Sequence, residues 1–278
     1  MGFWRRARGA AQWPLRCPAG PAHGVGLFSP EGHSPPEPFP TDRPIRIGLL
    51  NMHGGKGAGN RADLDRTAAA LGGLDVIGLN EVHGPKAGRP DQAARLGRKL
   101  GLPWLFAPTE RRFGRMSFGN GLLSRLPAVA WQRIPVLGTK KQRSFLLARL
   151  DWGGTGLNVL VTHVDRRRDR VEQLRTLLAL FRCLAEPVVL MGDMNTPDDD
   201  PRIQALLAEP GVTAVPGVGQ AGRQRVDWMV VRGLRATAGE MIDTDCSDHP
   251  LVRAELALPA QGEAGAASTH AKDASIGS

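Results

Sequence analysis

Four apolar runs of this sequence each end at a polar side chain that can bind a metal ion or carry a proton. IRIGLL ends at Asn51 and DVIGLN at Glu81, whereas LNVLVT ends at His163 and PVVLMG at Asp193. Short apolar runs that alternate with stretches of helical spacing predict the buried strands of an α/β domain. In such domains the carboxyl ends of the strands lie at one edge of a sheet, where ligands bind. One such residue alone would be an ordinary turn residue, but four in succession predict a functional site.

Further polar residues extend this pattern toward the carboxyl end of the chain. Asn195 lies two positions after Asp193, and Asp248 and His249 stand at the start of another predicted strand. Oxygen donors with few imidazoles favour Mg²⁺ or Mn²⁺. The sequence contains no HExxH motif, and its three cysteines lack CxxC spacing, which disfavours a zinc site, a disulfide scaffold and an iron–sulfur cluster.

Hydrophobic periodicity predicts four helices and a larger number of strands. Helical spacing occurs over residues 62–71, 91–100 and 169–184, and Asp200 followed by Pro201 predicts the capped start of a helix that runs to 208. Strands are predicted at 45–50, 75–79, 103–107, 119–124, 128–136, 143–151, 156–163, 187–191, 226–231, 236–242 and 250–256.

Composition divides the chain into three parts. Residues 1–44 contain nine of the 22 prolines and no apolar periodicity, so we predict a disordered leader. Residues 259–278 are small and polar, and we predict a disordered tail. Residues 45–258 are then the folded domain. No apolar run approaches the length of about 18–20 residues that a membrane span needs. We also expect the protein to be a monomer and to lie in the cytoplasm.

The positive charge of the chain belongs to the folded domain. The whole chain has 36 basic and 27 acidic residues, and the predicted domain keeps 30 and 22 of them, a net charge of +8. Four arginines (166, 167, 168 and 170) closely follow His163, and Arg223 and Arg225 precede Asp227. If these segments border the site, they favour a polyanionic substrate; a solvated helix start is the alternative for the first group.

A series of motifs resembles one known family. In order along the chain these are NMHGG (51–55), LNEVHG (79–84), GNGLLSR (119–125), VTHVD (161–165), LMGDMNTPDD (190–199), VDWMVV (226–231) and SDHPLV (247–252). Together they resemble the successive motifs of the endonuclease/exonuclease/phosphatase superfamily, also called DNase I-like. The resemblance covers about 200 residues. It implies a four-layer α/β sandwich of two packed mixed or antiparallel sheets flanked by helices, and Mg²⁺-dependent hydrolysis of a phosphoester.

The resemblance also implies roles for individual residues. Glu81 would be the main metal ligand, with Asn51 beside it and Asp248 at a second metal position. Asp193 would orient or deprotonate the attacking water, and Asn195 would position Asp193 and the phosphate.

The remaining roles concern the histidines. His249 would contact the phosphate as an acid/base or electrostatic group, and Asp227 would hold its working tautomer. His163 would stabilise charge on the phosphoryl oxygens. The resemblance implies membership of one site more firmly than it separates the base from the acid.

Some neighbouring features receive weaker interpretations. GGKGAG at 54–59 lacks the spacing of a phosphate-binding P-loop and is interpreted as a flexible loop beside the site. Asp198, Asp199 and Asp200 are interpreted as turn and cap residues rather than metal ligands. His53 and His83 follow site residues by two positions, and a role outside the site is favoured for both. Arg143 resembles a family arginine, and a surface ion pair is an equally open interpretation.

Three functions are compatible with the sequence. The first is a Mg²⁺- or Mn²⁺-dependent phosphodiesterase, most simply a nuclease. The second is the same chemistry on anionic lipid headgroups or inositol phosphates, and the third is a catalytically inactive binding module. The third is disfavoured because every core polar residue is present. Abasic-site repair enzymes of the family carry a tyrosine where this chain has His163, and the absence of tyrosine from the sequence disfavours that subgroup.

Overall fold

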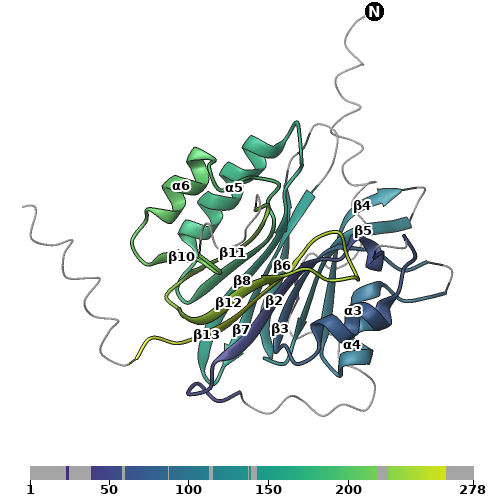
Figure 1. Ribbon diagram of the computed structural model, residues 1–278, viewed down its shortest axis with the longest axis horizontal. Coiled ribbons are helices and arrows are strands. Elements are labelled where there is room, and N and C mark those ends of the chain that lie inside the picture. The colour runs from purple at the N-terminus through teal and green to yellow at the C-terminus, as the bar shows by residue number, and fades with distance from the viewer. Residues whose placement is uncertain are drawn as a thin grey trace, which may run out of the picture.

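The computed structural model describes residues 23–24, 39–57, 60–86, 88–112, 115–136, 138, 143–217 and 225–260. Two mixed β-sheets pack face to face, and helices cover the outer face of each sheet (Figure 1). The predicted four-layer α/β sandwich is therefore confirmed.

The seven-stranded sheet contains, in spatial order, β1 (His23–Gly24), β6 (Ala128–Val136), β7 (Arg143–Trp152), β8 (Thr155–His163), β9 (Val188–Asp193), β11 (Asp227–Arg232) and β10 (Val212–Ala214). The six-stranded sheet contains β12 (Arg235–Ile242), β13 (Leu251–Ala257), β2 (Ile45–Asn51), β3 (Val76–Val82), β5 (Arg115–Ser124) and β4 (Trp104–Arg112). Helices α5 (Arg170–Cys183) and α6 (Pro201–Leu207) cover the first sheet, and α3 (Leu64–Leu71) and α4 (Gln92–Leu100) cover the second (Figure 1).

The continuous apolar runs of the central strands are explained by burial on both faces. In β2, Ile47 and Leu49 face the core between the two sheets, whereas Leu50 faces the core beneath α3 and α4. Because successive side chains of a strand point to opposite faces, a strand covered on both sides needs apolar residues at nearly every position. The polar residues at the ends of these runs therefore mark the edge of the sandwich.

Side-chain capping explains where α3, α4 and α6 begin. The Asp63 carboxylate accepts hydrogen bonds from the backbone N–H groups of Asp65 (2.9 Å) and Arg66 (3.2 Å), and so starts α3. Asp91 caps α4 through the N–H of Ala94 (2.8 Å). Asp200 caps α6 through the N–H of Arg202 (3.0 Å), which agrees with its interpretation as a cap residue.

The packed domain begins before the predicted boundary at residue 45. Phe39 is buried in the core between the sheets, and the carbonyl oxygen of Pro40 accepts a hydrogen bond from Trp152 Nε1 (3.1 Å). The proline-rich composition concealed this contact because one aromatic residue produces no periodicity. Apart from β1, residues 1–38 of the predicted leader and residues 261–278 of the predicted tail lie outside the described residues. Among the described helices, none is long and apolar enough to span a membrane.

Two parallel strand pairs bring the predicted polar residues together. β2 pairs with β3 so that Asn51 lies opposite Asn80, and β8 pairs with β9 so that His163 lies opposite Asp193. β11 runs antiparallel to β9 and places Asp227 opposite Asp193. The expectation of one sheet edge needs a correction, because the two pairs belong to different sheets that meet across the sandwich.

Candidate functional site

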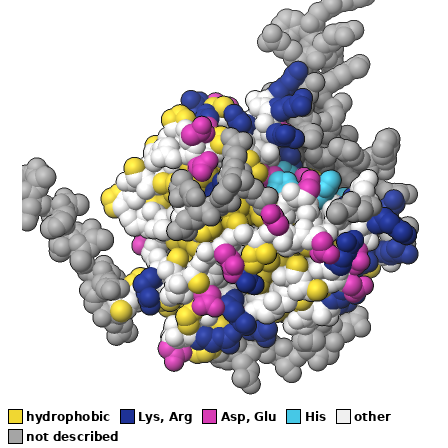
Figure 2. Space-filling model, viewed as in Figure 1, with side chains coloured by type: hydrophobic (Ala, Val, Ile, Leu, Met, Phe, Trp, Pro, Cys, Tyr) yellow, Lys and Arg dark blue, Asp and Glu magenta, His cyan; other side chains and the backbone are white. Residues whose placement is uncertain are grey.

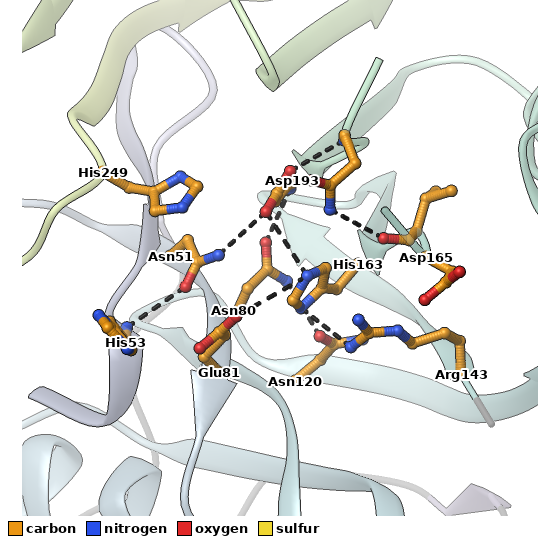
Figure 3. Close-up of polar contacts among 12 residues, drawn as sticks. Asn51, His53, Asn80, Glu81, Asn120, Arg143, His163, Asp165, Asp193 and His249 are labelled. Atoms are coloured by element: carbon orange, nitrogen blue, oxygen red, sulfur yellow. Dashed lines mark hydrogen bonds and ion pairs between the residues drawn. The ribbon is translucent and has the colours of Figure 1, made fainter. Parts of the chain in front are cut away.

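Asp193, the last residue of β9, lies at the centre of the site and is almost completely buried. Asn51 Nδ2 donates a hydrogen bond to its Oδ2 (3.0 Å), and the backbone N–H of Asn195 donates to its Oδ1 (2.9 Å). The backbone N–H of Asp193 itself donates to Asn80 Oδ1 (2.8 Å). Figure 3 shows these contacts reaching Asp193 from both sheets. The carboxylate is therefore held in one orientation.

The backbone on both sides of Asp193 has an unusual conformation, which orients the Asn195 side chain. A Cβ atom at Gly192 would lie 1.9 Å from the carbonyl oxygen of Thr162, so only glycine fits before Asp193. Asn195 has a positive φ of 47°, and its side chain donates to the carbonyl oxygen of Val164 (3.0 Å). Strained conformations of this kind concentrate at functional sites.

His163, the last residue of β8, faces both Asp193 and Glu81. Its Nε2 lies 3.5 Å from Asp193 Oδ2 and 3.9 Å from Glu81 Oε1. Arg143 Nη1 lies 3.2 Å from its Nδ1. Because a guanidinium group only donates hydrogen bonds, Nδ1 is the acceptor and the proton of the neutral ring is on Nε2. The ring thus presents an N–H group toward the two carboxylates.

His249 and Asp227 form a second pair beside Asp193. His249 Nδ1 lies 2.8 Å from Asp227 Oδ2, and the backbone N–H of His249 donates to Ser247 Oγ (3.2 Å). Ser247 Oγ in turn donates to the carbonyl oxygen of Asn51 (2.5 Å), which ties this loop to β2. Burial alone would lower the pKa of His249, but the hydrogen bond and charge of Asp227, with the charge of Asp193, raise it to about 9.

The environment of Asp193 raises its pKa, which makes the carboxylate a stronger base. Burial, and next the charge of Asp227, raise the pKa of Asp193 to about 7, while His249 acts in the opposite direction. A carboxylate with a pKa near 7 can both accept and release a proton at neutral pH.

Glu81 provides an open carboxylate at the site. It has a positive φ of 56°, and the pairing of β3 with β5 shifts register between Leu79 and Val82. This irregularity turns the Glu81 side chain toward His163, where it is about one quarter exposed.

The predicted metal ligands fit a hard divalent cation. Glu81 and the Asn51 amide lie on neighbouring strands, and both present oxygen donors. Asp248 is largely exposed, and its Oδ1 lies 3.1 Å from His53 Nδ1, so it adds a second acidic group at this side. The Nδ1 or Nε2 and carboxylate oxygen atoms of Asp193, Asp227 and His249 also lie within 4.8 Å of one another. A protonated His249 that is bonded to Asp227 is a poor ligand, so Glu81 and Asn51 are the better candidates.

Sequence reasoning missed two buried asparagines that hold the site together. Asn80 Nδ2 donates to Asn120 Oδ1 (2.9 Å) and to the carbonyl oxygen of Thr162 (2.7 Å). Asn120 Nδ2 donates to the carbonyl oxygen of Ser144 (2.8 Å). Both lie in the six-stranded sheet and bond to the seven-stranded sheet. The available sequence signal was a polar residue inside an apolar run. This signal does not reveal the hydrogen-bond partners, because they come from distant segments of the chain.

The weaker candidates have different outcomes. His53 contacts Asp248, whereas the His83 ring packs against Gly54, where an added Cβ would approach its Nε2 to 2.7 Å. Arg143 contacts His163, as described above, and is not a surface residue.

The arginines near the site also divide into two groups. Arg225 is buried, donates to the carbonyl oxygens of Pro216 (2.8 Å) and Gly217 (3.0 Å), and stacks on Trp228, so it does not border the site as a free charge. Arg223 lies outside the described residues. Arg166, Arg167 and Arg168 are exposed. Figure 2 shows histidine and acidic side chains clustered at one end of the visible face, with Lys and Arg side chains beside them.

The comparisons with known proteins agree with this geometry. The model of the Endonuclease/Exonuclease/phosphatase family matches residues 48–249. A search of curated protein sequences gives no significant match.

Several solved structures share the fold. An endonuclease/exonuclease/phosphatase from Beutenbergia cavernae has 27% sequence identity and a TM-score of 0.63, with 78% of this chain and 72% of that chain covered. D. rerio TDP2 complexed with a single-strand DNA product has 18% identity and a TM-score of 0.60, with 77% and 98% covered. The human Nocturnin catalytic domain with a bound sulfate anion has 14% identity and a TM-score of 0.59, with 78% and 94% covered.

Proposed function

The chain belongs to the endonuclease/exonuclease/phosphatase family, and from this premise we propose that it is a Mg²⁺- or Mn²⁺-dependent phosphodiesterase that cleaves nucleic acid. One observation carries the proposal. Asp193, a buried carboxylate with a pKa of about 7, lies between the Asn51 amide, the Nε2–H of His163 and the charged His249–Asp227 pair. This arrangement places a base (Asp193), two uncharged hydrogen-bond donors (Asn51 and His163) and one positively charged side chain (His249) close together.

In the proposed reaction Asp193 accepts a proton from the attacking water. Asn51 donates a hydrogen bond to Oδ2 of Asp193, and the backbone N–H of Asn195 donates one to Oδ1. Each oxygen therefore keeps a lone pair in a fixed direction that can accept a proton. Because the pKa of Asp193 lies near 7, the carboxylate is available as a base at neutral pH and its protonated form can give up the proton afterwards.

His249 and His163 act on the charge of the phosphate. Asp227 holds Nδ1 of His249, which leaves its Nε2–H free to donate to a phosphoryl or leaving-group oxygen. Its pKa of about 9 keeps the ring positively charged at neutral pH. His163 is neutral and offers Nε2–H as a donor. Such preorganised donors stabilise the charge that develops in the transition state.

A divalent cation completes the proposed site. Glu81 and Asn51 would hold it, with Asp248 as a further acidic group, and the bound ion would neutralise charge on a phosphoryl oxygen. Cys246, the cysteine nearest to Asp248 in the sequence, is buried in the core beneath α3 and α4, so its thiol is not a candidate ligand. The remaining candidate ligands offer oxygen atoms, which Mg²⁺ and Mn²⁺ prefer.

Nucleic acid is preferred over the other phosphoesters because of charge. The net charge of the folded domain is +8, and three consecutive exposed arginines begin three residues after His163. The alternative substrates, anionic lipid headgroups and inositol phosphates, require the same chemistry. The inactive binding module is disfavoured because the core polar residues, from Asn51 to His249, form a connected set of contacts.

Assays of the purified protein with Mg²⁺ test the proposal. We expect turnover of single-stranded DNA, double-stranded DNA or RNA, and loss of that turnover on addition of EDTA. Phospholipids and inositol phosphates serve as the competing substrates. Hydrolysis of either of these without any nuclease activity would overturn the nuclease assignment, and turnover that survives EDTA would overturn the metal dependence.

A further inference from the structure

The segment between β8 and α5 presents three consecutive arginines beside the candidate site. We call Arg166, Arg167 and Arg168 the arginine loop. All three side chains are exposed, and they begin three residues after His163. Among the described residues, none of the three guanidinium groups forms an ion pair. Their charge is therefore available to a ligand.

The backbone of the arginine loop is organised by one buried carboxylate. Asp165 Oδ2 accepts hydrogen bonds from the backbone N–H groups of Arg167 (3.1 Å) and Asp169 (3.4 Å). The backbone N–H of Asp165 donates to Gln173 Oε1 on α5 (2.8 Å). These bonds turn the backbone polar groups inward and leave the arginine side chains in solvent. The loop thus has a defined shape before any ligand binds.

Hydrogen bonds also join the arginine loop to the segment that carries Asp193 and Asn195. The backbone N–H of Val164 donates to the carbonyl oxygen of Asp193 (2.9 Å), and Asn195 Nδ2 donates to the carbonyl oxygen of Val164 (3.0 Å). Arg170, just after the loop, donates through Nη1 to the carbonyl oxygen of Asn195 (3.2 Å). The loop therefore flanks Asp193 and Asn195.

Resting on the proposed function, we propose that the arginine loop binds the phosphates that flank the scissile phosphate of a polynucleotide strand. In the proposed mechanism the scissile phosphate already has donors in His163 and His249, so three additional unpaired cations exceed what a single phosphoester needs. Consecutive Cα atoms lie about 3.8 Å apart, so the three guanidinium groups can reach more than one phosphate along a strand. A chain of phosphodiesters supplies such a row of charges.

Binding of a labelled oligonucleotide tests this role. The probe is a fluorescein-labelled single-stranded oligodeoxynucleotide of about 12 nucleotides, measured by anisotropy in EDTA between about 50 and 200 mM salt. The test variant is R166A/R167A/R168A in the full chain. The matched control is R98A/R149A/R235A, which removes the same charge from exposed arginines of α4, β7 and β12 that, among the described residues, also form no ion pair. We expect Kd to rise about tenfold or more for the test variant at low salt, and less than about threefold for the control.

The salt dependence and a small substrate make the result specific. Loss of three phosphate contacts should reduce the slope of log Kd against log salt by about 2, because each contact to a single strand contributes about 0.7. Hydrolysis of bis(p-nitrophenyl) phosphate, which has one phosphate, should change by less than about twofold. Equal losses of binding in test and control variants, or an equal loss of activity toward the small diester, would overturn the proposal.

The two proposals fail in different ways. If the unaltered protein hydrolyses no phosphodiester but binds the oligonucleotide through the loop, the proposed function is wrong and the role of the loop stands. If the protein cleaves phosphodiesters and the loop variant binds the oligonucleotide as well as the control does, the loop proposal alone is wrong.

Discussion

At the scale of single residues, Asp193 combines burial with a negative charge. Its pKa of about 7 means that the ionised carboxylate is less favourable in the folded protein than in the unfolded chain. The folded state therefore loses stability as the pH rises from about 3.8 to about 7, and the cost stays constant above that range. The charge required by the proposed chemistry is thus held at the expense of stability.

Replacing this carboxylate should separate activity from stability. We expect Asp193→Asn to lower kcat by about 10³-fold or more, because the proposed base is lost. In metal-free protein, the fall in free energy of unfolding between pH 4 and pH 8 should be about 1–3 kcal/mol smaller in this variant, because its amide does not titrate. Urea unfolding at the two pH values measures this difference. Activity close to that of the unaltered protein would remove Asp193 from the mechanism.

His249 has the opposite linkage to pH. Its folded pKa of about 9 lies above the ordinary value of 6.5, so the Asp227 contact contributes stability below pH 6.5 and loses it as the pH rises through 9. We expect NMR titration of metal-free protein to show one imidazole with a pKa of about 9. In Asp227→Asn that pKa should fall, because the charge of Asp227 and its hydrogen bond to the charged ring are lost. An unchanged titration in this variant would contradict the assigned pairing.

At the scale of elements, the site depends on how two parallel strand pairs are fixed to each other. β2 and β3 supply Asn51 and Glu81, whereas β8 and β9 supply His163 and Asp193. The Asn80 side chain makes three hydrogen bonds, and two of them, to the Thr162 carbonyl oxygen and from the Asp193 N–H, cross to the seven-stranded sheet. Its amide is fully buried, so it fixes the register of the two strand pairs as well as stabilising them.

Loss of this connection should cost both stability and activity. Asn80→Leu leaves the Asp193 N–H, the Thr162 carbonyl and the Asn120 amide oxygen without their partner, and we expect a loss of about 2–4 kcal/mol in free energy of unfolding. Asn158→Leu is the matched control, because Asn158 is a buried β8 asparagine whose side chain donates one bond, to Ala185 (2.7 Å). Urea denaturation with kcat measured in parallel tests this, and equal losses in both variants would argue against a special role for Asn80.

At the scale of the whole molecule, three apolar cores and the buried Phe39 define the extent of the domain. Phe39 packs into the core between the sheets, and Pro40 is bonded to Trp152. A chain that starts at residue 39 keeps both contacts, whereas one that starts at residue 45 loses them. These two truncations therefore locate the boundary.

The cost of the longer truncation follows from the buried ring. Removing residues 1–44 rather than 1–38 should lower the free energy of unfolding by about 2–3 kcal/mol, since it uncovers the cavity that a buried aromatic side chain fills. Phe39→Ala in the full chain is the control and should reproduce most of this loss. Equal stability of the two truncated proteins would place the boundary at residue 45, as composition predicts.

Much of the fold and the membership of the site could be predicted because both depend on local patterns. Residues 170–183 form a helix with apolar residues at the predicted spacing, and β9 ends at Asp193 as its apolar run does. The predicted strand list omitted β1 and β10, which have two and three residues and therefore too few for a period to show. Asn80 and Asn120 escaped prediction for a related reason, because their function depends on partners in the other sheet.

Local sequence patterns predict most of the strands, the polar residues that end them and the oxygen donors that can accept a metal ion. These properties depend on residues a few positions apart. Three other properties require the folded molecule. Asn51 and Asp193, 142 positions apart in the chain, share a hydrogen bond, Arg143 sets the tautomer of His163, and the pKa values of Asp193 and His249 are raised to about 7 and about 9. Burial and charge proximity set these properties, and both arise only when distant segments pack together.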